Sequence, residues 1–318
     1  MGKKLYRTAA PLLAALSVAL SACAGPIGVP PAPTPNPLAV PASQNHVHGE
    51  GGAAGRLVTR YGGPTGVSLA LQPETPRPGT EVEITYALSD AQGAPVPGDG
   101  LRIVHERLMH LIVVGQDLRS FAHLHPEEAG GGRYRVTETL PETGKYVLFN
   151  EFVTADGVTQ IERNVVATEG AESADNPAAL TPDLGTTKES AGLQGVLTTP
   201  VTRIRRRIAT PFFLDVTQGG KPATELEPFL GAACHVVIVS ADTKQFAHTH
   251  GDLPGGALSG DMSKADMATM AMPTPPAKFG PRVEFTHTFM QPGMYRLWVQ
   301  LGHGAEVATF AYNVMVEK

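Results

Sequence analysis

The sequence contains little cysteine, few aromatic residues and no large excess of one charge. Of its 318 residues, two are cysteine and 6% are aromatic, and the formal net charge is −5 at pH 7. This charge gives no basis for nucleic-acid binding. After residue 23, no apolar run approaches the ~20 residues of a membrane helix. The abundance of glycine and proline, 35 and 28 residues, favours short strands, many turns and proline-rich linkers.

The amino-terminal segment predicts export. Three basic residues precede a short apolar run at residues 11–20, as in a secretory signal peptide. Leu-Ser-Ala-Cys follows at residues 20–23 and resembles the lipobox of bacterial lipoproteins. The resemblance implies cleavage of residues 1–22 as a lipoprotein signal peptide and acylation of Cys23. The protein would then be anchored to a membrane on the periplasmic or cell-surface side of the envelope. The alternative is an ordinary signal peptide with an incidental cysteine.

The cysteine count restricts how an exported chain of this kind is stabilised. If Cys23 carries lipid, Cys234 is the only thiol left and no internal disulfide can form. The exported domains must then rely on core burial, with metal as a further source of stability.

Self-similarity divides the rest of the chain into two related domains. A Pro/Gly-rich tether at residues 23–59 is followed by domains at residues 60–168 and 196–318, with a linker at residues 169–195. Apolar runs in both domains are short and β-branched, and residues 82–86 alternate as a half-buried strand does. The prediction is an all-β fold of two tandem immunoglobulin-like antiparallel β-sandwiches.

The clearest repeat is a histidine-rich segment. Residues 109–125 (MHLIVVGQDLRSFAHLH) recur without a gap as residues 234–250 (CHVVIVSADTKQFAHTH). One histidine in the first half and a His-X-His in the second half keep identical spacing. Each copy is predicted to be a β-hairpin.

The expected register places three imidazoles of each hairpin on one face. Val114 is expected to pair with Phe121 across the turn. His110 then lies opposite His125, and His123 shares their face because side chains two apart on a strand do so. Opposed Cβ atoms lie ~5 Å apart, and imidazoles there can converge on one ion at about 2.0 Å per bond. We therefore expect one metal site per domain, at His110, His123 and His125 and at His235, His248 and His250.

The other face of each hairpin is predicted to be core. Leu111 and Val113 lie on it in the first copy, and Cys234 takes the place of Met109 in the second. We expect a buried, inert thiol at Cys234, with thiolate ligation as the alternative.

A fourth histidine is expected at each site. His287 lies on the alternating run at residues 283–289 and is expected to complete the second site. The first domain has Glu138 at the matching place, but His105 lies five residues before His110 and is expected to fold back onto the first site.

The metal is predicted to be copper, Cu²⁺ or Cu⁺, rather than zinc. All-nitrogen sites suit both metals, and copper binds more strongly by the Irving–Williams order. The hairpins are 125 residues apart, whereas Gly144 and Gly293 are 149 apart, so the second domain has an insertion of 24 residues. This polar insertion contains methionines, whose thioethers favour Cu⁺. The alternative is a flexible linker whose four methionines have no role in metal binding: Met262, Met267, Met270 and Met272.

Residues 105–114, with the ending at residues 121–126, resemble exported bacterial β-sandwich modules linked to copper handling. A His-X-His strand with further histidines on a sandwich is also similar to copper-containing superoxide dismutases. That resemblance implies four-histidine copper that cycles between Cu²⁺ and Cu⁺, with superoxide as substrate. This sequence departs from the family because no zinc loop with an Asp ligand is evident, so such an enzyme would be of the copper-only kind. The implied ligands are His123 and His125, or His248 and His250, with His110 or His235 and a fourth from His105 or His287.

The leading prediction is a cell-envelope copper-only superoxide dismutase, and the sequence leaves other functions open as alternatives. A copper-only superoxide dismutase would use His110, His123 and His125 as its catalytic set, with Arg107, Arg119 or Lys244 steering the anion. A non-catalytic chaperone or buffer would exchange copper with a partner, and a structural module would use ions to brace its hairpins. A zinc hydrolase needs a general base that no residue is placed to supply. A basic run is either a solvated edge or a contact to an acidic envelope partner: Arg203, Arg205, Arg206 and Arg207.

Overall fold

Strands form where β-branched and aromatic residues alternate with polar ones. In β2 (Glu81–Ser89), the side chains of Val82, Ile84 and Tyr86 are buried, and the residues between them are partly exposed. In contrast, β4 (Met109–Gly115) and β15 (Cys234–Ser240) are buried at every position. Near-continuous apolar runs of this kind are typical of strands that are covered on both faces.

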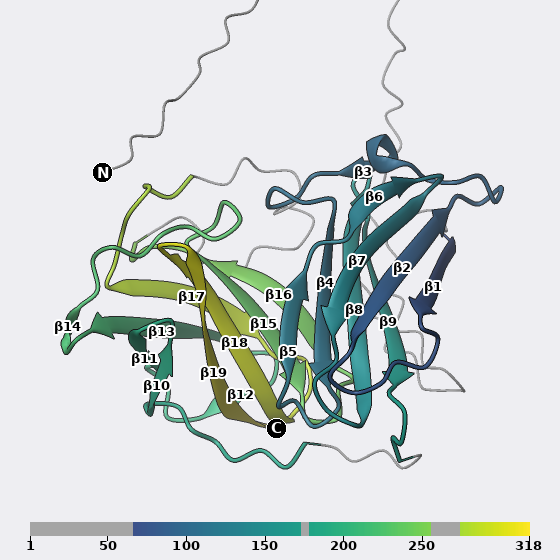
Figure 1. Cartoon of the computed structure of the whole chain (residues 1–318). Coiled ribbons are helices and arrows are strands. Elements are labelled where there is room, and N and C mark those ends of the chain that lie inside the picture. Colours follow the sequence, from purple (N-terminus) through teal and green to yellow (C-terminus); the bar gives the residue numbers. More distant parts are fainter. Residues whose placement is uncertain (1–65, 173–177, 256–273) are drawn as a thin grey trace, which may run out of the picture. The chain divides into compact units, whose positions relative to one another are not determined.

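The computed structural model describes residues 66–172, 178–255 and 274–318, all within one compact unit, His46–Lys318. The all-β prediction is confirmed, because these residues form strands and one short 3-10 turn, η1 (Gly98–Gly100) (Figure 1). No helix in the described ranges is long and apolar enough to span a membrane. The leader, the tether, Cys23 and the four methionines of the insertion lie outside the described residues.

Two sheets form the first sandwich. One has the order β1-β2-β7-β6, and the other has the order β3-β8-β4-β5 with β9 also paired to β8. The remaining strands are β1 (Gly66–Gln72), β3 (Leu101–Arg102), β5 (Phe121–Leu124), β6 (Glu127–Gly130), β7 (Arg133–Thr139), β8 (Lys145–Thr154) and β9 (Thr159–Ala167).

Two further sheets form the second sandwich. One has the order β10-β11-β13-β14 with β17 paired to β13, and the other has the order β12-β19-β18-β15-β16. All pairs are antiparallel except β12 with β19. The remaining strands are β10 (Thr187–Ser190), β11 (Leu193–Thr198), β12 (Ile204–Arg205), β13 (Ala209–Gln218), β14 (Lys221–Pro222), β16 (Phe246–Gly251), β17 (Arg282–Thr288), β18 (Gly293–His303) and β19 (Glu306–Glu317).

Each sandwich has its own apolar core between its two sheets. In the first, Ile84 and Tyr86 of β2 pack with Leu111 of β4. In the second, Phe212 of β13 packs in one cluster with Val236 of β15. The hairpin face that carries Leu111 and Val113 therefore lies in the core, as the alternation predicted.

The opposite faces of the two hairpins pack against each other. Ile112 and Phe149 of the first sandwich share one buried cluster with Val237 and Trp298 of the second. This packing explains why β4 and β15 are buried on both faces.

Aromatic residues of the two repeats stack on each other across this interface. The ring of Phe121 stacks on Trp298, with centroids 4.8 Å apart, and Phe149 stacks on Phe246 at 4.3 Å. Phe121 and Phe246 occupy the same position of the repeated hairpin, and Phe149 and Trp298 both lie five residues after a matching glycine. The two repeats therefore use equivalent surfaces on each other, as in a two-fold interface.

Candidate metal centre

The hairpin register is the one predicted from the sequence. Ile112 pairs with His123 and Val114 with Phe121 in the first copy. In the second copy, His235 pairs with His250, and Val237 pairs with His248. The histidine faces of both hairpins therefore point away from the core of their own sandwich.

The two histidine faces meet in one cluster between the sandwiches, rather than forming the two separate sites expected. The ring of His110 lies 5.0 Å from that of His248, and the ring of His123 lies 5.7 Å from that of His235, between centroids. The interface buries the faces that carry the histidines, so the two candidate sites become neighbours. We call the following seven residues the histidine cluster: His105, His110, His123, His125, His235, His248 and His250.

Backbone carbonyl groups orient one histidine in each repeat. Nε2–H of His110 donates to the carbonyl oxygen of Val104 at 3.0 Å, and Nε2–H of His235 donates to that of Leu230 in a longer contact of 3.5 Å. A carbonyl oxygen can only accept, so this nitrogen carries the proton in each neutral ring. The lone pair is then on Nδ1.

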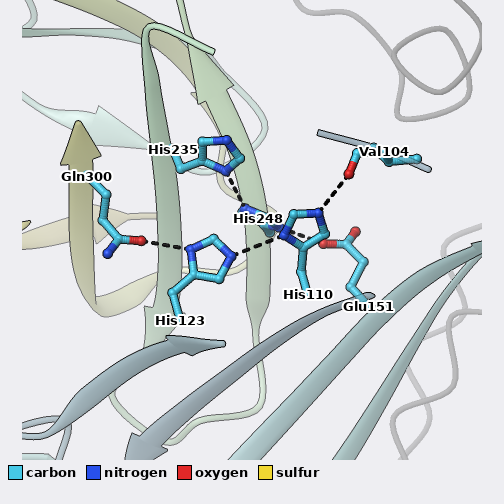
Figure 2. A network of polar contacts seen from close by, with 7 residues as sticks. All are labelled: Val104, His110, His123, Glu151, His235, His248 and Gln300. Atoms are coloured by element: carbon cyan, nitrogen blue, oxygen red, sulfur yellow. Dashed lines mark hydrogen bonds and ion pairs between the residues drawn. The ribbon is translucent and has the colours of Figure 1, made fainter. Parts of the chain in front are cut away.

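A polar side chain of the other sandwich orients a second histidine in each repeat. These side chains lie on β8 and β18 and make their hydrogen bonds across the interface. Nδ1–H of His123 donates to Oε1 of Gln300 at 2.8 Å, and Nδ1–H of His248 donates to Oε2 of Glu151 at 2.9 Å (Figure 2). Glu151 pairs with His110 on the neighbouring strand, and Gln300 pairs in the same way with His235. These contacts leave Nε2 of His123 and of His248 to act as ligand atoms, an arrangement common around protein-bound metals.

Two pairs of nitrogen atoms then face each other. Nδ1 of His110 lies 3.2 Å from Nε2 of His123, and Nδ1 of His235 lies 3.1 Å from Nε2 of His248. Two nitrogens that each bond a tetrahedral ion at ~2.0 Å lie ~3.3 Å apart. The observed spacings therefore suit two ligands of one ion.

Burial favours the neutral form of five imidazoles of the histidine cluster: His105, His110, His125, His235 and His250. Desolvation is the main cause of their low pKa values. The pKa is lowered to about 3 for His110 and to about 4 for His105 and His125. Desolvation also holds the pKa of His235 and of His250 well below the usual 6.5. Neutral imidazole is the form that binds metal, so protons compete weakly with an ion at neutral pH.

Several ring nitrogens are buried without a partner. Nε2 of His125 and both ring nitrogens of His250 find no hydrogen-bond partner among the residues that the structure describes. A buried polar atom left in this state costs roughly 1–3 kcal/mol. Coordination to a metal ion would remove this cost, so the donor set fits a metal.

Three groups of histidines could each hold a metal ion, because their ligand atoms lie within 4.8 Å of one another. The first is the triad predicted for the first hairpin. The other two combine residues of both sandwiches, so the second hairpin does not form its predicted triad on its own. The groups are His110, His123 and His125; His105, His235 and His250; and His123, His235 and His248.

The two expected fourth ligands lie elsewhere than predicted. His105 was expected at the first site, but its ring stacks on His250 of the other sandwich, with centroids 3.5 Å apart. His105 and Glu106 form a tight turn closed by backbone hydrogen bonds between Val104 and Arg107, and their φ angles are 48° and 64°. His287 lies on β17, paired with Thr210 in the other sheet and in ring contact with Phe289. It belongs to none of the three groups.

The remaining predicted ligands are a cysteine and the methionines. Cys234 is fully buried in the core of the second sandwich, and burial raises the pKa of its thiol to about 12. This favours the inert thiol over a thiolate ligand. Met262, Met267, Met270 and Met272 lie outside the described residues, as does Cys23.

A small pocket reaches the cluster. It has a volume of about 50 Å³ and is lined by Glu151 together with four histidines: His105, His110, His248 and His250. A volume of this size admits a few water-sized molecules.

Sequence reasoning missed the roles of Glu151 and Gln300. A signal was present, because the two residues are 149 apart, the same offset as Gly144 and Gly293. Each is a polar residue in the middle of a buried apolar strand. Two polar residues at the same place in a repeat indicate a shared task.

The comparisons with known proteins agree with the repeated architecture. One family model, Domain of unknown function (DUF8832), matches twice, at residues 62–169 and 196–318. The chain belongs to the DUF8832 family. Each DUF8832 repeat thus contributes one histidine hairpin, and the cluster forms where the two repeats meet.

No curated protein matches the chain. Solved structures that share similarity with it include the Escherichia coli adhesin FdeC, with 14% identity over 79% of this chain and 64% of that chain and a TM-score of 0.25. The Yersinia pseudotuberculosis adhesin InvE has 11% identity over 79% of this chain and 59% of that chain, with a TM-score of 0.23. A Salmonella alpha-2-macroglobulin has 15% identity over 81% of this chain and 15% of that chain, with a TM-score of 0.22. The chain spans less than two thirds of each of these chains.

Proposed function

We propose that this protein binds copper in the histidine cluster and serves in the bacterial cell envelope as a lipid-anchored copper-binding protein. The observation that carries the proposal is the two facing nitrogen pairs, His110 with His123 and His235 with His248, at 3.2 and 3.1 Å. Each pair offers two oriented imidazole nitrogens to one ion.

The chemistry of the cluster favours copper over other ions. The seven side chains offer only imidazole nitrogen, which suits Cu²⁺, Zn²⁺ and Ni²⁺ rather than Ca²⁺ or Mg²⁺. Copper is the strongest binder of these in the Irving–Williams order. The methionine-rich insertion supports copper further, because thioethers bind Cu⁺ and could pass it to the cluster.

Burial of the ligands favours retention of the metal. His235 is 0% exposed, and His110 and His248 are each 4% exposed. An ion held by such residues exchanges slowly unless the interface opens. A high-affinity copper buffer is therefore the first functional class that this site supports, whereas transfer of copper to a partner would require the interface to open.

Superoxide dismutation is the second candidate, and the pocket beside Glu151 favours it. Copper at its walls could alternate between Cu²⁺ and Cu⁺, with two superoxide ions and two protons giving dioxygen and hydrogen peroxide. Arg107, whose positive charge acts on His125, is placed to attract an anion toward the cluster.

Export and anchoring rest on the leader alone. The proposal is that Cys23 carries the lipid and that the tether at residues 23–59 spaces the sandwiches from the membrane. Labelling with a radioactive fatty acid tests it. Label in the wild type and none in Cys23→Ser is expected, and label in both would contradict the lipid site.

Metal content tests copper binding directly. Full-length protein is incubated with equimolar Cu²⁺ and Zn²⁺, treated with a competing chelator, and its bound metals are counted. Copper retained in the wild type and lost in His123→Ala/His235→Ala, which removes a ligand from every group, supports the proposal, and preference for zinc or no bound metal contradicts it. Superoxide consumption by the copper-loaded protein then separates an enzyme from a buffer.

A further inference from the structure

We infer that the histidine cluster holds two metal ions close together, one bound by the first hairpin alone and one bound jointly by both sandwiches. This inference rests on the proposed function and specifies its stoichiometry and its ligands. The first ion would be bound by His110, His123 and His125. The second would be bound by His105, His235 and His250, with His248 adjoining.

The number of ligands exceeds what one ion can use. A tetrahedral ion takes four ligands, whereas the cluster contains seven histidines. Two of the three possible groups share no residue: His110, His123 and His125, and His105, His235 and His250. The cluster therefore divides without competition into two three-histidine sites.

The facing nitrogen pairs also occur at two separate places. The pair of His110 and His123 shares no residue with the pair of His235 and His248. Lone pairs that face each other at 3.1–3.2 Å repel unless a cation or a proton lies between them. An ion at each pair would relieve both repulsions at once.

Atoms without partners lie at both sites. Nε2 of His125 belongs to the first group, and the two ring nitrogens of His250 belong to the second. Each site thus has a third nitrogen that gains a partner only when an ion binds. A single ion would leave one of the two histidines unsatisfied.

The two ions would be near neighbours. The ligand nitrogens of His123 and His235 lie within 4.8 Å of each other. Ions bonded to those nitrogens at ~2.0 Å are then no more than roughly 9 Å apart. Two Cu²⁺ ions at this distance interact magnetically, which gives a readout independent of any activity.

The sites differ in what they need from the fold. The ligands of the first ion all come from β4 and from β5 with the residue that follows it. The second requires His105, which reaches the site only when the two sandwiches are packed together. The equivalent turn of the second repeat has Leu230, with the same φ of 48° as His105. His105→Leu therefore copies a residue that the fold already accepts at this position.

The test combines copper counting with electron paramagnetic resonance on the full chain. After loading with Cu²⁺ and removal of weakly held metal by a chelator, wild type is expected to retain two ions per chain. Its spectrum is expected to show a coupled pair, by loss of intensity or a half-field signal. His125→Ala and His105→Leu are each expected to retain one ion with an uncoupled spectrum, and His303→Gln, outside the cluster, to retain two.

The possible failures are distinguishable. A single ion in the wild type, or two ions without coupling, would overturn the two-ion inference and leave copper binding intact. No copper in the wild type would overturn the proposed function itself. Circular dichroism checks that each variant is folded, and His250→Asn replaces His105→Leu if the latter is not. Two coupled ions in both His105→Leu and His250→Asn would overturn the ligand assignment.

Discussion

His105 of the first sandwich stacks on His250 of the second, with ring centroids 3.5 Å apart. The contact joins the turn before β4 to the end of β16. It places a histidine of one repeat within ligand distance of two histidines of the other. A cluster of this kind is a property of the pair of repeats, and neither repeat can supply it alone.

Replacing His105 should weaken copper binding, whereas replacing His287 should not. His105→Leu removes one imidazole from a three-histidine group, and we expect the dissociation constant for Cu²⁺ at that site to rise by at least roughly 10-fold. His287→Ala leaves the histidine cluster intact. Competition with a coloured chelator measures both constants, and equal losses in the two variants would contradict the placement of His287.

Replacing Glu151 should lower copper affinity without unfolding the protein. Glu151 fixes the orientation of His248 and supplies negative charge near the ion, so Glu151→Gln should reduce Cu²⁺ affinity by about 10–100-fold. Glutamine fits the position, because Gln300 makes the equivalent contact with His123. The reciprocal Gln300→Glu is the matched variant and should raise affinity. Unchanged affinity in both would refute the orienting role.

Copper should stabilise the packing of the two sandwiches. An ion that binds only the folded state at 100 times its dissociation constant adds about 2.7 kcal/mol. For a protein of this size, that amounts to a rise in Tm of roughly 5–10 °C. The fluorescence of Trp298, the only tryptophan and a residue of the interface, reports the transition. An equal Tm with copper and with chelator would contradict binding to the folded state.

The register and the two faces of the hairpins could be predicted from sequence because strand periodicity determines them. A period of two fixes which side chains share a face, and the short turn fixes the pairing of Val114 with Phe121. The all-β fold followed for the same reason, from short β-branched runs with frequent turns.

The merging of the two sites could not be predicted from local patterns. It depends on the packing of two sheets that are far apart in the sequence, seen in the stacking of Phe121 on Trp298. One clue was available: residues 110–114 and 235–239 are apolar on both faces apart from the histidine, so each strand needs cover on its outer face. His105 is five residues from His110 in the sequence, but its contact with His250 exists only because the two sandwiches pack together.

The thiol of Cys234 should be unreactive in the folded protein. It is fully buried, and its pKa of about 12 leaves it protonated at pH 8–9, where an exposed cysteine begins to ionise. An alkylating reagent at pH 8.5, followed by mass spectrometry of the peptide that contains Cys234, should detect label only after denaturation. Rapid labelling of the native protein would contradict the inert thiol and support thiolate ligation by Cys234.

A crystal structure of the copper-loaded protein, with anomalous differences measured at the copper edge, tests the central claim most directly. The predicted result is anomalous density between the sandwiches, about 2.0 Å from Nδ1 of His110 and Nε2 of His123, with a second peak near His235 and His250. Anomalous density only on the outer surface, or none on the histidine cluster, would contradict copper binding at the interface.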